Sequence, residues 1–308
     1  MKEKYYLSFL LFFSLLLSLF FLVSCASKEV PKEVIANTPN KLVDENNHIH
    51  SIAFDPTDAG KMYIATHYYL EKVDLQTGEK EKRGKYGDDY MGFVIASDGI
   101  FYSSGHSPAV ANVGIRRSLD KGNTWETLAY EGYDFHDMAV SSADAQRIYA
   151  WSTPPEEFLT LSKDGGKNWE KISEMQQQGI KGSIFALEAD KQLAKKVYAG
   201  TLFGLFISSD GGKNWVAEES IKNLPVIAIA DDAQQEGKFT LATADKIIQS
   251  TDGGKTWKDL TGNFDQKEEV IIFLTIDSAT GKIYGVTKHS KVYVYEEGKE
   301  WKEFSLKK

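Results

Sequence analysis

The residues of this chain best suited to chemistry are its few histidines. The 308 residues include six histidines, and five of them lie in the first half of the sequence: His48, His50, His67, His106 and His136. Each stands at the start or just past the end of a short segment typical of a β-strand. Neutral imidazole is a common protein ligand of zinc and copper, so a cluster of these side chains would favour a divalent metal site.

Spacing and neighbouring residues define this metal hypothesis further. His48 and His50 are two residues apart, so on a strand their side chains point to the same face. Asp134 or Asp137, which flank the fifth histidine, could complete or orient the ligand set. The hypothesis assigns one zinc or copper ion to four histidines: His48, His50, His67 and His136.

Two other interpretations of the histidines stay open. The first is a metal-free site for a small polar ligand, with His106, Trp151 and Asp134 as the ligand-binding candidates. The second is a structural role, in which the imidazoles hydrogen-bond to loop carbonyl groups. Which of the three interpretations holds depends on the secondary-structure elements that position these side chains.

Those elements are indicated by an eight-residue pattern, Ser-x-Asp-x-Gly-x-x-Trp, which occurs four times at intervals of 42 to 46 residues. Its Ser and Asp can satisfy backbone groups within a turn, and its Gly tolerates positive φ. We therefore expect four hairpins, each with a Trp opening the outgoing strand. The pattern residues are Ser118, Asp120, Gly122 and Trp125; Ser162, Asp164, Gly166 and Trp169; Ser208, Asp210, Gly212 and Trp215; and Ser250, Asp252, Gly254 and Trp257.

The repeat extends beyond these four copies. A turn at 74–78 lies one period upstream, and a degraded copy at 294–301 lies one period downstream. Repeats of this length with hairpin signals predict an all-β fold, a β-propeller of four-stranded antiparallel blades. We expect six blades, with seven as the alternative, in one domain over residues 46–308.

The turn copies resemble Asp-box (BNR) repeats, which occur in sialidases, sortilin-type receptor domains and bacterial extracytoplasmic propellers. The segments 48–56, 65–67, 104–106 and 134–136 also resemble bacterial propellers described as glycosyl-hydrolase-like. This resemblance implies that the boxes lie on the face opposite any active site. Propeller geometry would bring the five histidines, from three adjacent blades, to the box-free mouth of the central channel.

An enzymatic function is the next question. A sialidase clamps its substrate carboxylate with three arginines. This chain has four in total, Arg83, Arg116, Arg117 and Arg147, and we expect none of them at the channel mouth. Another glycosidase would need only two carboxylates, with Asp134 and Asp137 as the catalytic candidates and Trp151 as a surface for a sugar ring. Other carboxylates expected on that face are Asp88, Asp89, Glu156 and Glu157.

The amino-terminal residues predict where the protein is located. A short charged start precedes an apolar run at 5–23, which ends at Leu-Val-Ser-Cys with Cys25, the only cysteine. This resembles the bacterial lipoprotein signal. The resemblance implies a signal peptide at 1–24, lipidation of Cys25, a flexible tether at 25–45 and a propeller facing the extracytoplasmic side of the membrane. An uncleaved transmembrane anchor is the alternative.

Net charge narrows the possible partners. The formal charge is −8 and no basic run is present, which argues against nucleic-acid binding. We therefore expect a monomeric, membrane-anchored binding module with a histidine-rich channel mouth for a metal ion or small ligand. Its alternatives are a glycoside hydrolase-like enzyme and a platform for protein partners in a membrane complex.

Overall fold

The computed structural model describes residues 47–173, 180 and 183–306. These residues belong to one compact unit, from Pro39 to Lys308. The predicted signal peptide, Cys25 and the tether lie outside the described residues. Within the described ranges, no helix has both the length and the apolar character that a membrane crossing needs.

The described residues form six four-stranded antiparallel sheets, each made of consecutive strands. Blade 1 comprises β1 (Ile49–Phe54), β2 (Lys61–Thr66), β3 (Leu70–Asp74) and β4 (Lys80–Arg83). Blade 2 comprises β5 (Phe93–Ile95), β6 (Phe101–Ser103), β7 (Ile115–Ser118) and β8 (Glu126–Ala129). Blade 3 comprises β9 (Phe135–Ser141), β10 (Asp144–Ser152), β11 (Leu159–Ser162) and β12 (Glu170–Ser173).

The second half repeats this plan. Blade 4 comprises β13 (Ile184–Ala189), β14 (Val197–Thr201), β15 (Gly204–Ser208) and β16 (Val216–Ala217), followed by the short 3-10 helix η2 (Glu219–Ile221). Blade 5 comprises β17 (Val226–Asp231), β18 (Phe239–Thr243), β19 (Ile247–Ser250) and β20 (Lys258–Asp259). Blade 6 comprises β21 (Ile271–Asp277), β22 (Lys282–Thr287), β23 (Val292–Tyr295) and β24 (Lys302–Glu303).

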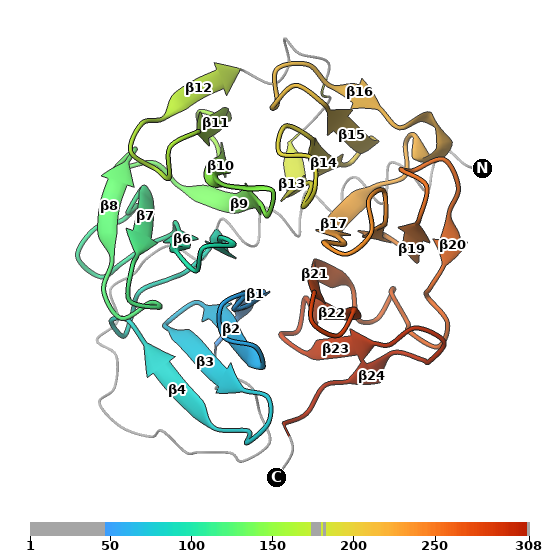
Figure 1. The fold of residues 1–308 in the computed structure, drawn as a ribbon, viewed down its shortest axis with the longest axis horizontal. Helices are drawn as coiled ribbons and strands as arrows, with labels where there is room; N and C mark the ends of the chain where they lie inside the picture. Colours follow the sequence, from blue (N-terminus) through green and yellow to red (C-terminus); the bar gives the residue numbers. More distant parts are fainter. Residues whose placement is uncertain (1–46, 174–179, 181–182, 307–308) are drawn as a thin grey trace. The chain divides into compact units, whose positions relative to one another are not determined.

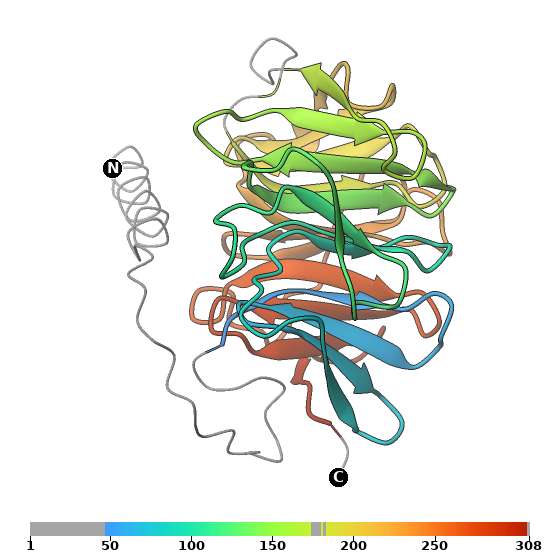
Figure 2. The ribbon, with the colours of Figure 1, turned by 90° about the vertical axis from the view of Figure 1, so that its left-hand side faces the viewer.

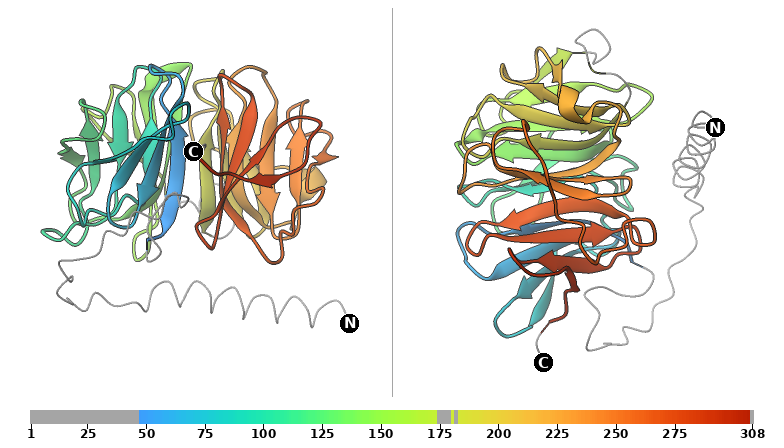
Figure 3. Two further views of the ribbon diagram at one scale, coloured as in Figure 1. Left: turned by 90° about the horizontal axis from the view of Figure 1, so that it is seen from below. Right: turned by 90° about the vertical axis from the view of Figure 1, so that its right-hand side faces the viewer.

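The six blades form a closed ring with the first strand of each blade innermost (Figure 1). Side views show the blades as layers packed face to face, with β1 running along the ring axis (Figures 2 and 3). β1 contacts β21, and the Ile49 amide donates to Ser290 Oγ at 3.0 Å, so the first and last blades meet. The predicted six-bladed, all-β propeller is confirmed, and the seven-bladed alternative is wrong.

The four copies of the eight-residue pattern form the hairpins between the third and fourth strands of blades 2 to 5. In each, the Ser hydroxyl donates to the Asp carboxylate at 2.8–2.9 Å and accepts from the Gly amide at 2.8 Å. The Gly residues have φ between +86° and +98°, where a side chain would be strained. The donor and acceptor of each bond belong to the same eight-residue copy, so the local sequence alone is sufficient to predict the turn.

The histidines and these hairpins lie at opposite ends of the strands. Ser118 pairs with Phe101, the first residue of β6, whereas His106 follows the end of that strand. His67 likewise follows the end of β2. This geometry leaves one mouth of the channel free of the repeated hairpins, as the sequence predicts.

Candidate functional site

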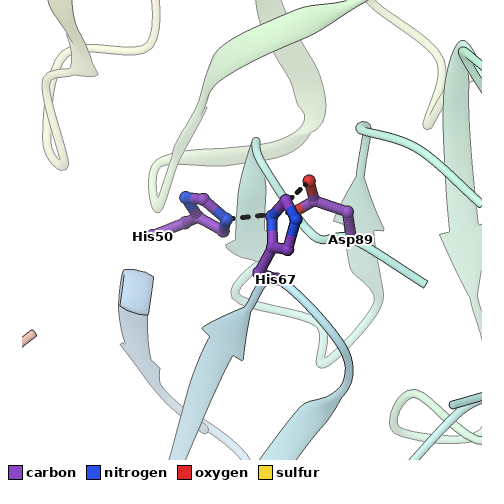
Figure 4. Close-up of side chains that lie close together, drawn as sticks. All are labelled: His50, His67 and Asp89. Atoms are coloured by element: carbon purple, nitrogen blue, oxygen red, sulfur yellow. Dashed lines mark ion pairs between the residues drawn. The ribbon is translucent and has the colours of Figure 1, made fainter. Parts of the chain in front are cut away.

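Three histidines surround the carboxylate of Asp89 at the box-free mouth. His50 Nε2 lies 3.0 Å from Asp89 Oδ1, and His67 Nδ1 lies 3.0 Å from Oδ2. His106 Nδ1 contacts Oδ2 at 3.2 Å. The Asp89 side chain is only 5% exposed, while the His67 ring is half exposed. The site therefore has a buried acidic centre and an open outer side; Figure 4 shows His50, His67 and Asp89 together.

A second aspartate extends the cluster toward blade 3. His136 Nε2 lies 2.6 Å from Asp134 Oδ2, and His106 Nε2 lies 3.5 Å from the same oxygen. His106 thus stands between two carboxylates, with one ring nitrogen directed at each. Four of the five predicted histidines are joined in this way across blades 1 to 3.

The backbone sets these positions. His67 donates its amide to the His48 carbonyl at 3.1 Å, while Asp89 and His106 exchange backbone bonds of 2.9 and 3.3 Å. Gly105 has φ of +128°, and a Cβ there would collide with the Asp89 carbonyl oxygen. Glycine at 105 therefore allows the two loops to approach closely enough for His106 to reach Asp89.

Charge pairing shifts the pKa values of the cluster. Burial alone would raise the pKa of Asp89, but His106, His50 and His67 hold it well below its ordinary value. The pKa of Asp134 is lowered against its burial by His106 and His136. Asp134 and Asp89 in turn raise the pKa of His106 to about 10, and Asp89 raises that of His67. The two aspartates are therefore carboxylates at neutral pH.

One part of the cluster has the geometry of a metal site. Donor atoms of His50, His67 and Asp89 all lie within 4.8 Å of one another. His50 Nε2 and Asp89 Oδ1 are buried and 3.0 Å apart, yet neither makes a hydrogen bond within the described part of the chain. Two such atoms facing each other leave a position between them that a cation could take in place of their direct ion pair. Two imidazoles with one carboxylate are ligands that suit zinc and related divalent ions.

This geometry revises the ligand set expected from the sequence. His50 and His67 belong to the donor group, and Asp89 joins them. His48 is exposed and outside the group; loss of solvation and the nearby imidazoles of His50 and His67 lower its pKa. His136 pairs with Asp134 instead. The sixth histidine, His289, contacts Glu269 at 3.2 Å.

Two further predictions from the sequence concern Trp151 and Asp137. Trp151 is 4% exposed and packs in the hydrophobic core between blades 3 and 4, so its ring offers no face to a sugar; that prediction is wrong. Asp137 Oδ2 accepts the Leu187 amide at 2.5 Å, and burial raises the pKa of this carboxyl well above its ordinary value. Asp137 and His136 border a cavity of about 220 Å³ that the innermost strands enclose.

Arg116, which we expected away from the channel mouth, has partners that the sequence did not reveal. Its side chain is 5% exposed, and Nη1 lies 2.7 Å from Asp88 Oδ2. The adjacent acidic residues Asp88 and Asp89, just before an inner strand, were the available signal. They indicated carboxylates at the mouth but gave no sign of their partners.

Comparison with known proteins places the chain among β-propellers. No protein-family model matches it. An oligoxyloglucan-reducing end-specific xyloglucanase of Emericella nidulans is 25% identical over 248 residues, covering 80% of this chain and 25% of the relative. A probable enzyme of the same description from Neosartorya fischeri is 28% identical over 145 residues, covering 40% and 17%. The chain thus spans about a quarter or less of the length of these relatives.

Solved structures show the same fold. A GH74 enzyme of Niastella koreensis matches with a TM-score of 0.58 and 12% identity, covering 82% of this chain and 46% of that one. The GH74 xyloglucanase of Xanthomonas campestris matches with a TM-score of 0.55 and 18% identity, covering 80% and 44%. A chain of a nidogen/laminin complex gives 0.61 and 12%, covering 79% and 92%. At these identities the likeness concerns the fold alone.

Proposed function

We propose that this propeller is a metal-binding module whose box-free mouth holds one divalent cation, with zinc as the leading candidate. His50, His67 and Asp89 are its ligands. The observation that carries the proposal is the convergence of buried His50 Nε2 and Asp89 Oδ1, 3.0 Å apart and outside hydrogen-bond geometry. The two atoms form an ion pair without hydrogen-bond geometry, and a cation bound between them would compensate their burial more fully.

The remaining cluster residues orient this ligand set. His106 donates to Asp89 from one ring nitrogen and faces Asp134 with the other, which fixes the plane of the Asp89 carboxylate. Zinc bound by three protein ligands would supply Lewis acidity to a further ligand or to water. The half-exposed ring of His67 leaves the outer side of the site open to such a ligand.

Metal analysis of the purified protein, prepared without a histidine tag, tests this proposal directly. About one equivalent of zinc, removed by chelator and restored on reconstitution, would support it. Absence of metal after reconstitution would contradict it and favour a metal-free ligand site or a protein-interaction platform at the same mouth.

The location proposal rests on sequence. We propose that Cys25 carries a lipid anchor and that the four hairpins are Asp-box repeats of an extracytoplasmic bacterial propeller. The wild-type protein should incorporate a radiolabelled fatty acid supplied to the host bacterium and Cys25→Ser should not, measured by autoradiography after immunoprecipitation. Absence of label on the wild-type protein would favour the alternative of an uncleaved transmembrane anchor.

A glycoside hydrolase-like function is the second candidate. It is favoured by the description of the curated relatives and by Asp134 and Asp137, whose pKa values move in opposite directions. Such a pair suits a carboxylate and a general acid. If this function holds, xyloglucan oligosaccharides should release new reducing ends, and Asp137→Asn should reduce turnover by about 100-fold or more, the scale of general acid catalysis.

Asp137→Asn also separates the two functions. The Asn side chain can still accept the Leu187 amide, and position 137 is outside the zinc donor group. We therefore expect the variant to retain zinc. No release of reducing ends by the wild-type protein would contradict the hydrolase candidate on this substrate without affecting the metal proposal.

A further inference from the structure

Arg116 is a buried cation that contacts two neighbouring aspartates and two aromatic rings, although its Nε makes no hydrogen bond with any of the described residues. It lies on β7, two residues before the Ser118 hairpin. Its Nη1 donates to Asp88 Oδ2 at 2.7 Å, and its Nη2 donates to the Asp89 carbonyl at 3.3 Å. The guanidinium carbon lies 4.5 Å from the centre of the Tyr90 ring and 5.0 Å from that of Trp125.

Such an arrangement is specific to arginine. Burying a charge is costly unless it is paired and hydrogen-bonded, and here a carboxylate, a carbonyl and two aromatic faces provide the compensation. The planar guanidinium reaches Asp88 and Asp89 at once, which a single ammonium group would do poorly. Arg116 therefore constrains both the side chain of one aspartate and the main chain of the next.

The segment that Arg116 constrains lies outside the strands and is held by backbone bonds to neighbouring loops and strand ends. Residues 84–92 connect β4 to β5 and belong to no strand of the described sheets. Near Asp89, the Asp89 amide donates to the His106 carbonyl at 2.9 Å and the His106 amide donates back at 3.3 Å. The Tyr90 and Met91 amides donate to the Thr66 and Ser104 carbonyls, each at 3.1 Å. These bonds fix the main chain, and Arg116 adds a contact to the Asp88 carboxylate. The Asp89 carboxylate must nevertheless meet His50 and His67 to within a fraction of an ångström if it is to share a metal with them.

We propose that Arg116 is the positioning residue of the metal site. It touches no metal and acts through the Asp88 side chain and the Asp89 carbonyl, holding the Asp89 carboxylate toward His50 and His67. This inference rests on the proposed function. Through its contacts with Trp125 and Asp89, Arg116 also connects the Ser118 hairpin to the opposite mouth of the channel.

The test compares Arg116→Met with Arg117→Met in the full-length protein. Arg117 is the matched control, since it lies on the same strand but contacts Glu126 at 2.6 Å and the Gly165 carbonyl at 3.3 Å. Zinc affinity is measured by competition with a chromophoric chelator. We expect Arg116→Met to weaken zinc binding about 10- to 100-fold, the usual effect of removing a residue that orients a ligand. Arg117→Met should stay within about twofold of wild type, and Arg116→Lys should recover part of the loss.

A metal-independent measurement separates positioning from general destabilisation. In the metal-free protein, hydrogen exchange at the Asp89 amide should accelerate in Arg116→Met and not in Arg117→Met, while thermal unfolding shows both variants folded. If Arg116→Met does not fold, Asp88→Asn removes the charged partner with little change of shape and should weaken zinc binding in the same direction.

Three outcomes would overturn the inference. The first is wild-type zinc affinity in Arg116→Met. The second is unchanged exchange at Asp89 in that variant. The third is wild-type zinc affinity in Asp88→Asn. Failure of the wild-type protein to bind zinc is a different result, because it contradicts the proposed function, and the exchange measurement then decides the role of Arg116 by itself.

Discussion

We expect His50→Ala to abolish stoichiometric zinc binding and His289→Ala to leave the zinc content unchanged. His50 supplies one of three donor atoms that lie within 4.8 Å of one another, whereas the ring of His289 contacts Glu269. Loss of a direct ligand should weaken affinity on the order of 100-fold or more, since even residues that only orient ligands cost 10- to 100-fold. Both variants lose one histidine, so the comparison controls for nonspecific binding.

Thermal unfolding with added zinc gives an independent measurement of this prediction. A ligand that binds only the folded state stabilises it by about 2.7 kcal/mol at a free concentration 100 times its Kd. Zinc should therefore raise the unfolding temperature of wild type and His289→Ala but not that of His50→Ala. Equal stabilisation of all three proteins would place the metal elsewhere.

The same site should respond to pH in a defined direction. Contact with Asp89 raises the pKa of His67, so the metal-free ring keeps its proton to a higher pH than a free histidine. His67 must lose that proton to bind zinc, so affinity should fall as pH drops through the raised pKa. Without metal, the His67–Asp89 contact stabilises the fold fully below about pH 6.5, and this contribution is lost as pH rises through the raised pKa.

The parts of this molecule that the sequence predicts are those determined by short-range rules. Ser118, Asp120 and Gly122 close their turn within eight residues, so the pattern alone is sufficient to identify the hairpin. The period then implies a propeller, and the propeller implies which strand ends share a mouth. That is why the grouping of His50, His67 and His106 could be predicted before their partners were known.

The partners depend on contacts between loops and blades that the repeat period does not specify. Asp89 was one acidic residue among several, and its contact with three imidazoles follows from the close approach of two loops at Gly105. Arg116 is buried against Asp88, whereas its neighbour Arg117 pairs with Glu126 and reaches the Gly165 carbonyl, and the two identical residue types do not reveal this difference. Trp151 follows β-strand alternation into the core rather than into the mouth.

Tryptophans at the same position of the repeated hairpin differ in how deeply they are buried. We expect the largest loss of stability from replacing the most buried of them. Trp215→Ala should lower the free energy of unfolding by about 3–5 kcal/mol. The ring is 6% exposed, packs in the hydrophobic core shared by blades 3 and 4, and donates its indole N–H to the Gly212 carbonyl at 2.9 Å. Urea denaturation of the purified protein measures the loss.

Trp257→Ala is the matched variant, because Trp257 occupies the same position in the next copy of the hairpin. Its ring is only partly buried and donates to Ser220 Oγ instead of the local glycine carbonyl. We expect a loss of about 1–2 kcal/mol there, since less apolar surface leaves water. Equal losses for the two variants would mean that the bonds within each hairpin, rather than packing between blades, determine how much each repeat contributes to the stability of the ring.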